Sequence, residues 1–215
     1  MEVCLVLLSA CGSSFLNALF SLRYGPHADP TSANERWLIG MFQQVIALLL
    51  LAYVLSRRSL RFKDFGLSWS LKDAVASVFV TAFAYLSYLY GAMLVQTVYH
   101  SIYGAFAKTL SGKDFYSHPP LVAIPYALLN PFFEELIVRA YLMTEVRELT
   151  GSVSLAIAAS VAVQFSYHIY YGWVGALSLS FQFLVFALYY ARTQRILPVV
   201  LAHGFFDIYA ISRLM

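Results

Sequence analysis

Long stretches without charge constrain this chain more than any other feature of its sequence. Residues 151–191 contain no Asp, Glu, Lys or Arg, and residues 74–99 form a second run of this kind. A membrane-spanning helix needs about 20 predominantly apolar residues. The run at 151–191 is therefore long enough for two spans, and Tyr170-Tyr171-Gly172 provides a turn between them.

The overall composition supports the same interpretation. Of the 215 residues, 60% are hydrophobic and 12% are charged, whereas soluble domains average about 45–50% apolar and about 25% charged residues. Because the bases gather between the apolar runs, the net charge of +3 needs no nucleic-acid partner to explain it. Cys4 and Cys11 lie in the same first apolar segment, which indicates neither a disulfide framework nor a metal site.

The apolar pattern predicts an all-α polytopic membrane protein with about seven transmembrane helices, within a range of six to eight. We expect residues 1–215 to form a single integral membrane domain around a polar intramembrane cavity. The predicted spans are residues 3–22, 37–55, 74–99, 121–146, 152–170, 173–190 and 198–211. In the fourth span, Asn130 and Pro131 suit the N-cap and the first position of a helix. The helix is therefore expected either to restart there inside the membrane or to carry an ordinary proline kink.

The Lys and Arg residues predict how the spans are oriented. Residues 56–73 carry five bases interleaved with aromatic side chains, which is typical of a topogenic loop, of a segment lying on an anionic leaflet, or of both. With seven spans, one side receives Arg57, Arg58, Arg61, Lys63, Lys72, Arg147, Arg192 and Arg195, and the other receives Arg23, Arg36, Lys108, Lys113 and Arg213. Cytoplasmic loops carry an excess of Lys and Arg. We therefore expect a multi-pass protein of the plasma (inner) membrane with a cytoplasmic N-terminus.

Three ionisable residues interrupt the apolar fourth span. Glu134, Glu135 and Arg139 fall within six residues, and one ionised side chain at the centre of a membrane helix costs roughly 2.5–3.5 kcal/mol on insertion scales. At about 100° per residue, Glu135 and Arg139 lie about 40° apart, whereas Glu134 and Arg139 lie about 140° apart. Glu135 is therefore the predicted salt-bridge partner of Arg139, and Glu134 is left free to point elsewhere.

Three more ionisable residues fall inside later predicted spans. These are His168, His203 and Asp207, and the last two are four residues apart on one helix face. Because each of these groups would be costly alone, we expect them to converge with the glutamates in one polar pocket. A glutamate and a histidine can hold a water and take its proton, and a second histidine can donate to a developing oxyanion. These are the groups that peptide hydrolysis without a covalent nucleophile requires.

In order and spacing, Glu134-Glu135-x-x-x-Arg139, then His168, then His203-x-x-x-Asp207 resemble the three motifs of a known family. It is the CAAX protease and bacteriocin-processing (CPBP, or Abi) family of intramembrane endopeptidases, and the likeness covers residues 121–211. The resemblance implies a helical membrane fold around a conical cavity and a peptidase similar to the type II CAAX prenyl endopeptidases. It implies that Glu134 is the general base, that His168 orients the water, and that His203 and Asp207 form the oxyanion site. Glu135 and Arg139 match the remaining motif positions and would be a supporting pair.

Two positions depart from the family pattern. The second motif usually has Phe four residues before its histidine, and here that residue is Gln164. The third motif ends in Asn or Asp, and an ionised Asp207 cannot donate to an oxyanion. It must therefore be protonated, or instead orient His203.

Three hypotheses about function follow. The first is a glutamate-dependent endopeptidase without a cofactor, whose partner in the bilayer is a protein or peptide substrate, with or without a prenyl group. The second is a metalloendopeptidase in which Glu134, His168 and His203 bind zinc and a water completes the site. The third is a non-enzymatic scaffold, immunity protein or transporter, although a transporter normally shows a repeated architecture that this sequence lacks.

Overall fold

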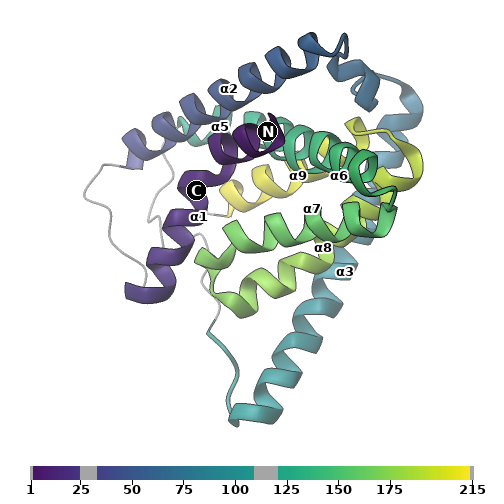
Figure 1. Cartoon of the computed structure of the whole chain (residues 1–215). Helices are drawn as coiled ribbons and strands as arrows, with labels where there is room; N and C mark the ends of the chain where they lie inside the picture. The colour runs from purple at the N-terminus through teal and green to yellow at the C-terminus, as the bar shows by residue number, and fades with distance from the viewer. Residues whose placement is uncertain (1, 25–32, 109–120, 214–215) are drawn as a thin grey trace.

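The computed structural model describes residues 2–24, 33–108 and 121–213, and its regular elements within these residues are all helical (Figure 1). The α-helices are α1 (Glu2–Tyr24), α2 (Ala33–Arg57), α3 (Leu71–Tyr103), α5 (Ala123–Glu134), α6 (Leu142–Thr150), α7 (Val153–Tyr167), α8 (Trp173–Thr193) and α9 (Leu197–Ser212). Two 3-10 helices, η1 (Phe62–Phe65) and η3 (Ile169–Tyr171), and one π-helix, η2 (Glu135–Tyr141), complete them. Residues 25–32 and 109–120, which include Lys113, lie outside the described residues.

Each predicted span falls on a helical segment, so the predicted all-α fold is confirmed. Among the described residues, three helices are long and apolar enough to cross a membrane: Trp37–Arg57, Leu71–Tyr103 and Trp173–Thr193. Shorter apolar helices cover Glu2–Leu16, Val153–Tyr167 and Leu197–Ser212. These helices are those of an all-α membrane protein, and the number of spans stays a prediction.

The fourth predicted span is one helical run made of α5, η2 and α6. Of the two predicted alternatives, the restart at Asn130 is wrong, because α5 begins at Ala123 and passes through Pro131 without ending. Proline in a helix interior removes one backbone hydrogen bond and crowds the carbonyl four residues earlier. The run continues into the wider π-helix η2, where the backbone N–H of Leu142 reaches back to Ile137. Such π segments are frequent at functional sites, and this one carries Glu135 and Arg139.

The longest helix, α3, extends well beyond the other helices at its C-terminal end (Figure 1). It has 33 residues, which corresponds to roughly 50 Å at 1.5 Å per residue. It packs closely on α8 where Gly91 meets Phe181, since a Cβ at Gly91 would lie 2.3 Å from the phenylalanine ring. Large apolar side chains of α3 such as Phe83 and Tyr90 are more than half exposed, as expected for a face turned toward lipid.

Several connections gather at one end of the bundle, which we call the basic end. It comprises residues 58–73, the α6–α7 turn and the α8–α9 connection (Figure 1). Its Lys and Arg residues are Arg58, Arg61, Lys63, Lys72 and Arg195. Arg58 pairs there with Glu2 and Glu145. The aromatic ring of Phe65 is buried, and its carbonyl accepts a hydrogen bond of 3.2 Å from the N–H of Ile196. The segment predicted to lie on an anionic leaflet is thus docked onto the protein, and its contact with lipid stays a prediction.

Candidate active site

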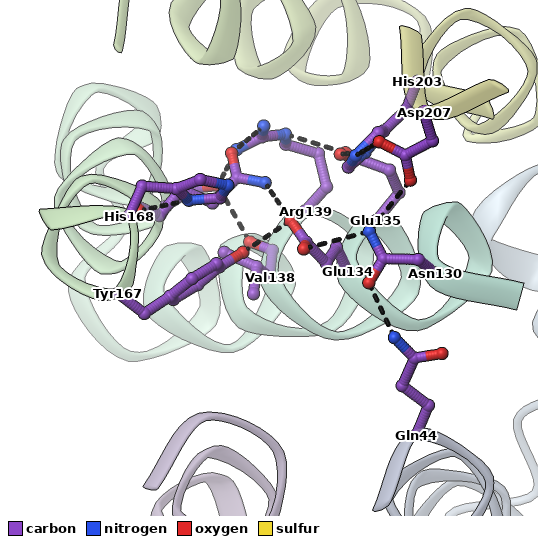
Figure 2. Close-up of polar contacts among 12 residues, drawn as sticks. Gln44, Asn130, Glu134, Glu135, Val138, Arg139, Tyr167, His168, His203 and Asp207 are labelled. Atoms are coloured by element: carbon purple, nitrogen blue, oxygen red, sulfur yellow. Dashed lines mark hydrogen bonds and ion pairs between the residues drawn. The ribbon is translucent and has the colours of Figure 1, made fainter. Parts of the chain in front are cut away.

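A connected set of polar side chains fills the space between α2, α5, α7 and α9, as Figure 2 shows. It contains the six residues that the sequence predicts: Glu134, Glu135, Arg139, His168, His203 and Asp207. It also contains Gln44, Asn130, Ser160, Gln164 and Tyr167. Segments that are far apart in the sequence therefore supply one site.

The centre of this set is the ion pair between Glu135 and Arg139. Nε of Arg139 donates to Oε2 of Glu135 at 3.0 Å, and neither side chain has any exposed surface. The guanidinium also donates to Oγ of Ser160 at 2.6 Å and to Oε1 of Gln164. Burying an ion pair is costly unless further hydrogen bonds complete it. The pair that the spacing predicts is present, and α7 supplies the remaining partners of Arg139.

His203, on α9, lies between two carboxylates. Its Nδ1 is 2.7 Å from Oε1 of Glu135, and its Nε2 is 3.5 Å from Oδ1 of Asp207. Because an ionised carboxylate only accepts hydrogen bonds, Nδ1 donates to Glu135. The buried ion pair therefore fixes the orientation of the imidazole ring.

Glu134 points away from Arg139 and toward α7. Its Oε2 accepts hydrogen bonds from the hydroxyl of Tyr167 at 2.7 Å and from the amide of Gln164 at 3.2 Å. Its Oε1 accepts one from the amide of Asn130 at 3.2 Å. The residue is only 7% exposed, so these three donors replace most of its water.

Asn130 joins Glu134 to Asp207. Its Nδ2 donates to Oδ2 of Asp207 at 3.0 Å as well as to Glu134, and its Oδ1 accepts from the amide of Gln44 at 2.7 Å. Because both carboxylates only accept hydrogen bonds, they determine which way the asparagine amide faces, and Gln44 of α2 donates to the oxygen that remains. The Asp207 side chain, at 25% exposed, has more contact with the surroundings than Glu134 or His203.

His168 terminates α7 and is half-buried beside Tyr167 and Phe183, with ring centroids 4.7 and 4.8 Å away. Its Nδ1 lies 2.8 Å from the backbone carbonyl of Gln164. A carbonyl only accepts, so the network assigns the proton to Nδ1. In the neutral ring Nε2 is then an acceptor, which is the form that can take a proton.

The site lies nearer the end of the bundle opposite the basic end. Along the α5–η2–α6 run, Glu134 is roughly 16 Å from Ala123 and roughly 24 Å from Thr150 at about 1.5 Å per residue. His168 is at the C-terminal end of α7, and Asp207 is in the C-terminal half of α9. All three helices therefore bring their site residues toward the same end.

Sequence reasoning missed five members of the network or assigned them otherwise. The sequence pattern places Asn130 at a helix cap, marks Gln164 only as a departure from a motif, and assigns no role to Gln44, Ser160 or Tyr167. A usable signal was present, because each of them is a hydrogen-bonding side chain within an apolar predicted span. A polar side chain in an apolar span does not reveal which helices are its neighbours.

The zinc alternative would use Glu134, His168 and His203 as ligands. Among the described residues, no three His, Cys, Asp or Glu side chains are grouped so that they could hold a metal ion. Nδ1 of His203 is turned to Glu135, and Glu134 accepts three hydrogen bonds from its neighbours. A zinc-binding histidine typically donates its other ring N–H to a carboxylate or a carbonyl, as His203 and His168 do here, so metal dependence stays a prediction.

Comparison with known proteins agrees with the motif-based resemblance. Residues 116–209 match the family model described as "Rce1-like: Type II CAAX prenyl endopeptidase Rce1-like". The matched segment contains Glu134, Glu135, Arg139, His168, His203 and Asp207. Neither the search of curated proteins nor that of solved structures found a significant match. The family resemblance is confirmed over this segment and supports an intramembrane endopeptidase of the CAAX protease type.

Proposed function

We propose that this protein, which matches the Rce1-like endopeptidase family over residues 116–209, hydrolyses a peptide bond near the membrane surface with a water activated by Glu134. One observation carries the proposal. The carboxylate of Glu134 is held by three donors within a buried network that also holds His203 on the facing helix. General-base hydrolysis requires a base held within hydrogen-bond reach of the water, and these donors hold the Glu134 carboxylate in one orientation.

The hydrogen bonds of Glu134 indicate where the water would bind. A carboxylate offers about four lone-pair positions, of which Tyr167 and Gln164 take two on Oε2 and Asn130 takes one on Oε1. The open position is therefore on Oε1, which faces toward Asn130. His168, protonated on Nδ1, presents Nε2 as an acceptor and would orient the same water.

His203 and Asp207 would stabilise the oxyanion that forms when the water attacks. Nε2 of His203 does not contact Glu135, and it would donate to a developing negative charge when the ring, which lies between the Glu135 and Asp207 carboxylates, is protonated on both nitrogens. Asp207 accepts from Asn130 and lies 3.5 Å from Nε2. These contacts support the role in which Asp207 orients His203, rather than donating to the oxyanion itself.

The protein needs no metal in this mechanism, since Glu134 itself takes the proton from the water. The zinc hypothesis makes a different prediction, namely that chelators abolish cleavage and that added Zn²⁺ restores it. Cleavage that persists in a strong chelator, by protein whose metal content has been measured as negligible, would support the metal-free mechanism.

Because the site lies nearer one end of the bundle, the orientation of the protein in the membrane determines from which side a substrate reaches it. Glu2 contacts Arg58 at the basic end, which supports a cytoplasmic N-terminus under the rule that basic loops stay inside. The site would then be nearer the outer surface, and a leader peptide or another membrane-associated peptide would reach it from there. A prenylated cytoplasmic C-terminus requires the opposite orientation, so mapping the location of the basic end also selects the substrate class.

The proposal is tested by cleavage assays with purified protein in detergent. The substrates are fluorogenic peptides with and without a prenyl group, and the control is Glu134→Gln, which keeps the side-chain volume. We expect kcat to fall by roughly 10²–10⁴-fold in this variant, since that is the usual contribution of a general base. Turnover that persists in folded Glu134→Gln protein would refute the mechanism. Failure of the folded wild type to cleave any peptide would favour the non-enzymatic hypothesis.

A further inference from the structure

Gln164 occupies the position at which the family motif usually has phenylalanine, and it is fully buried. Both the oxygen and the nitrogen of its side-chain amide form hydrogen bonds. Oε1 accepts from the guanidinium of Arg139, and Nε2 donates to Oε2 of Glu134 at 3.2 Å. A phenylalanine ring could make neither hydrogen bond.

The amide of Gln164 can face in only one direction. A guanidinium only donates hydrogen bonds and an ionised carboxylate only accepts them, so Oε1 must face Arg139 and Nε2 must face Glu134. Reversing the amide would set two donors against each other on one side and two acceptors on the other. Arg139 is itself held by Glu135 and Ser160. The direction of the Gln164 donor therefore follows from the buried ion pair.

We propose that Gln164 is a positioning residue that fixes the Glu134 carboxylate relative to the Arg139–Glu135 pair. This inference rests on the proposed role of Glu134 as general base. Glu135 holds His203 through Oε1 at 2.7 Å, and Arg139 holds Glu134 through Gln164. The buried Glu135–Arg139 pair thus sets the positions of both the Glu134 carboxylate and the His203 imidazole, so that their relative position is fixed.

The neighbouring hydrogen bonds explain why a donor is useful at this position. Gln164 and Tyr167 are three residues apart on one face of α7, and both donate to Oε2 of Glu134. Together they occupy that oxygen and leave an open position on Oε1 for the water. Without Gln164 the carboxylate could rotate and present either oxygen, and small misplacements of a reacting group are costly to catalysis.

The experiment compares Gln164→Met and Gln164→Glu with wild type. Methionine has a similar length and no amide. Glutamate keeps an acceptor for Arg139 but, when ionised, cannot donate to Glu134. Gln182→Met is the matched control, because Gln182 is also buried but lies on α8 outside the network of Figure 2. Two quantities are measured in each variant: the kinetic constants for peptide cleavage, and the carboxylate stretching band of Glu134. Infrared difference spectra against Glu134→Gln isolate that band.

We expect both Gln164 variants to lose roughly 10–100-fold in kcat with little change in KM, and to shift the Glu134 band. Gln182→Met should change neither quantity. An unshifted band, or a kcat close to that of wild type in Gln164→Met, would overturn the inference while leaving the proposed function in place. If wild type cleaves no peptide, the proposed function fails, and the infrared band still decides whether Gln164 holds Glu134.

Discussion

Two buried or half-buried ion pairs illustrate how differently this molecule uses charge. The Glu135–Arg139 pair has no exposed side-chain surface, and it is completed by His203, Ser160 and Gln164. The Asp73–Arg195 pair at the basic end has side chains that are 6% and 36% exposed. The Glu135–Arg139 pair, here called the inner pair, positions side chains of the site. The Asp73–Arg195 pair, here called the outer pair, joins the start of α3 to the α8–α9 connection.

The outer pair is part of a clamp that joins residues far apart in the sequence. Arg195 donates to Asp73 across 122 positions and to the carbonyl of Ser68 at 2.9 Å. Gly66 lies against the backbone of Gln194 and Arg195. The clamp therefore fixes the start of α9, the helix that carries His203, from outside the site. The contacts at the basic end therefore determine where α9 begins, whereas the contacts of the buried Glu135–Arg139 pair determine which way His203 faces.

The largest effect is expected from Arg139→Met, which leaves Glu135 buried without its counter-charge. Removing one partner of a buried ion pair typically costs about 3–5 kcal/mol, which corresponds to a loss of roughly 6–20 °C in melting temperature for a domain of this size. Peptide cleavage should fall with it, because Gln164 and His203 lose their common anchor. Thermal unfolding in detergent micelles and the cleavage assay measure the two effects.

The double variant Arg139→Met with Glu135→Gln is the control for this prediction. It removes the orphaned charge, so part of the lost melting temperature should return while cleavage stays low. If Arg139→Met alone melts within 2 °C of wild type, a threshold set below the expected fall, the inner pair is not the anchor that the geometry indicates.

An intermediate effect is expected from Gly66→Ala in the outer clamp. Gly66 has φ +77°, and a Cβ there would lie 2.3 Å from the carbonyl oxygen of Gln194 and 2.6 Å from Cα of Arg195. The left-handed conformation alone costs a non-glycine residue roughly 1–2 kcal/mol, and the clash requires backbone to move as well. Gly104→Ala is the matched control, since Gly104 has φ +68° but nothing within 4 Å of the added Cβ. Equal losses of melting temperature in the two variants would show that Gly66 makes no close contact with the α8–α9 connection.

The smallest effect is expected from Arg195→Gln. Because the Arg195 side chain is 36% exposed, solvent screens the pair, and the loss should fall between the values for surface and buried pairs, roughly 1–2 kcal/mol. Added salt should weaken the wild-type contribution of this pair and leave that of the inner pair nearly unchanged. The measurement is the difference in melting temperature between wild type and variant at low and high salt. Cleavage activity should remain, and its loss would mean that the clamp also acts on the site.

Much of the site could be predicted because its charges stand out against apolar sequence. The cost of burying Glu134, Glu135, Arg139, His203 and Asp207 makes each of them conspicuous, and helical spacing alone pairs Glu135 with Arg139. Of the two alternatives at Asn130 and Pro131, the helix restart is wrong, because the local preferences for a helix start are overridden by a run that continues into a π-helix.

Three features follow from the amino-acid sequence alone: the helical class, the places of the helices along the chain and the i,i+4 ion pair. Each depends on local periodicity or on the cost of charge in an apolar run. Other contacts are evident only in the folded molecule: those of Tyr167 and Gln164 with Glu134, that of Asn130 with Asp207, and that of Arg195 with Asp73. Those contacts depend on which helices lie side by side and on how each is rotated about its axis. Helix packing fixes both, and no spacing within a single segment encodes them.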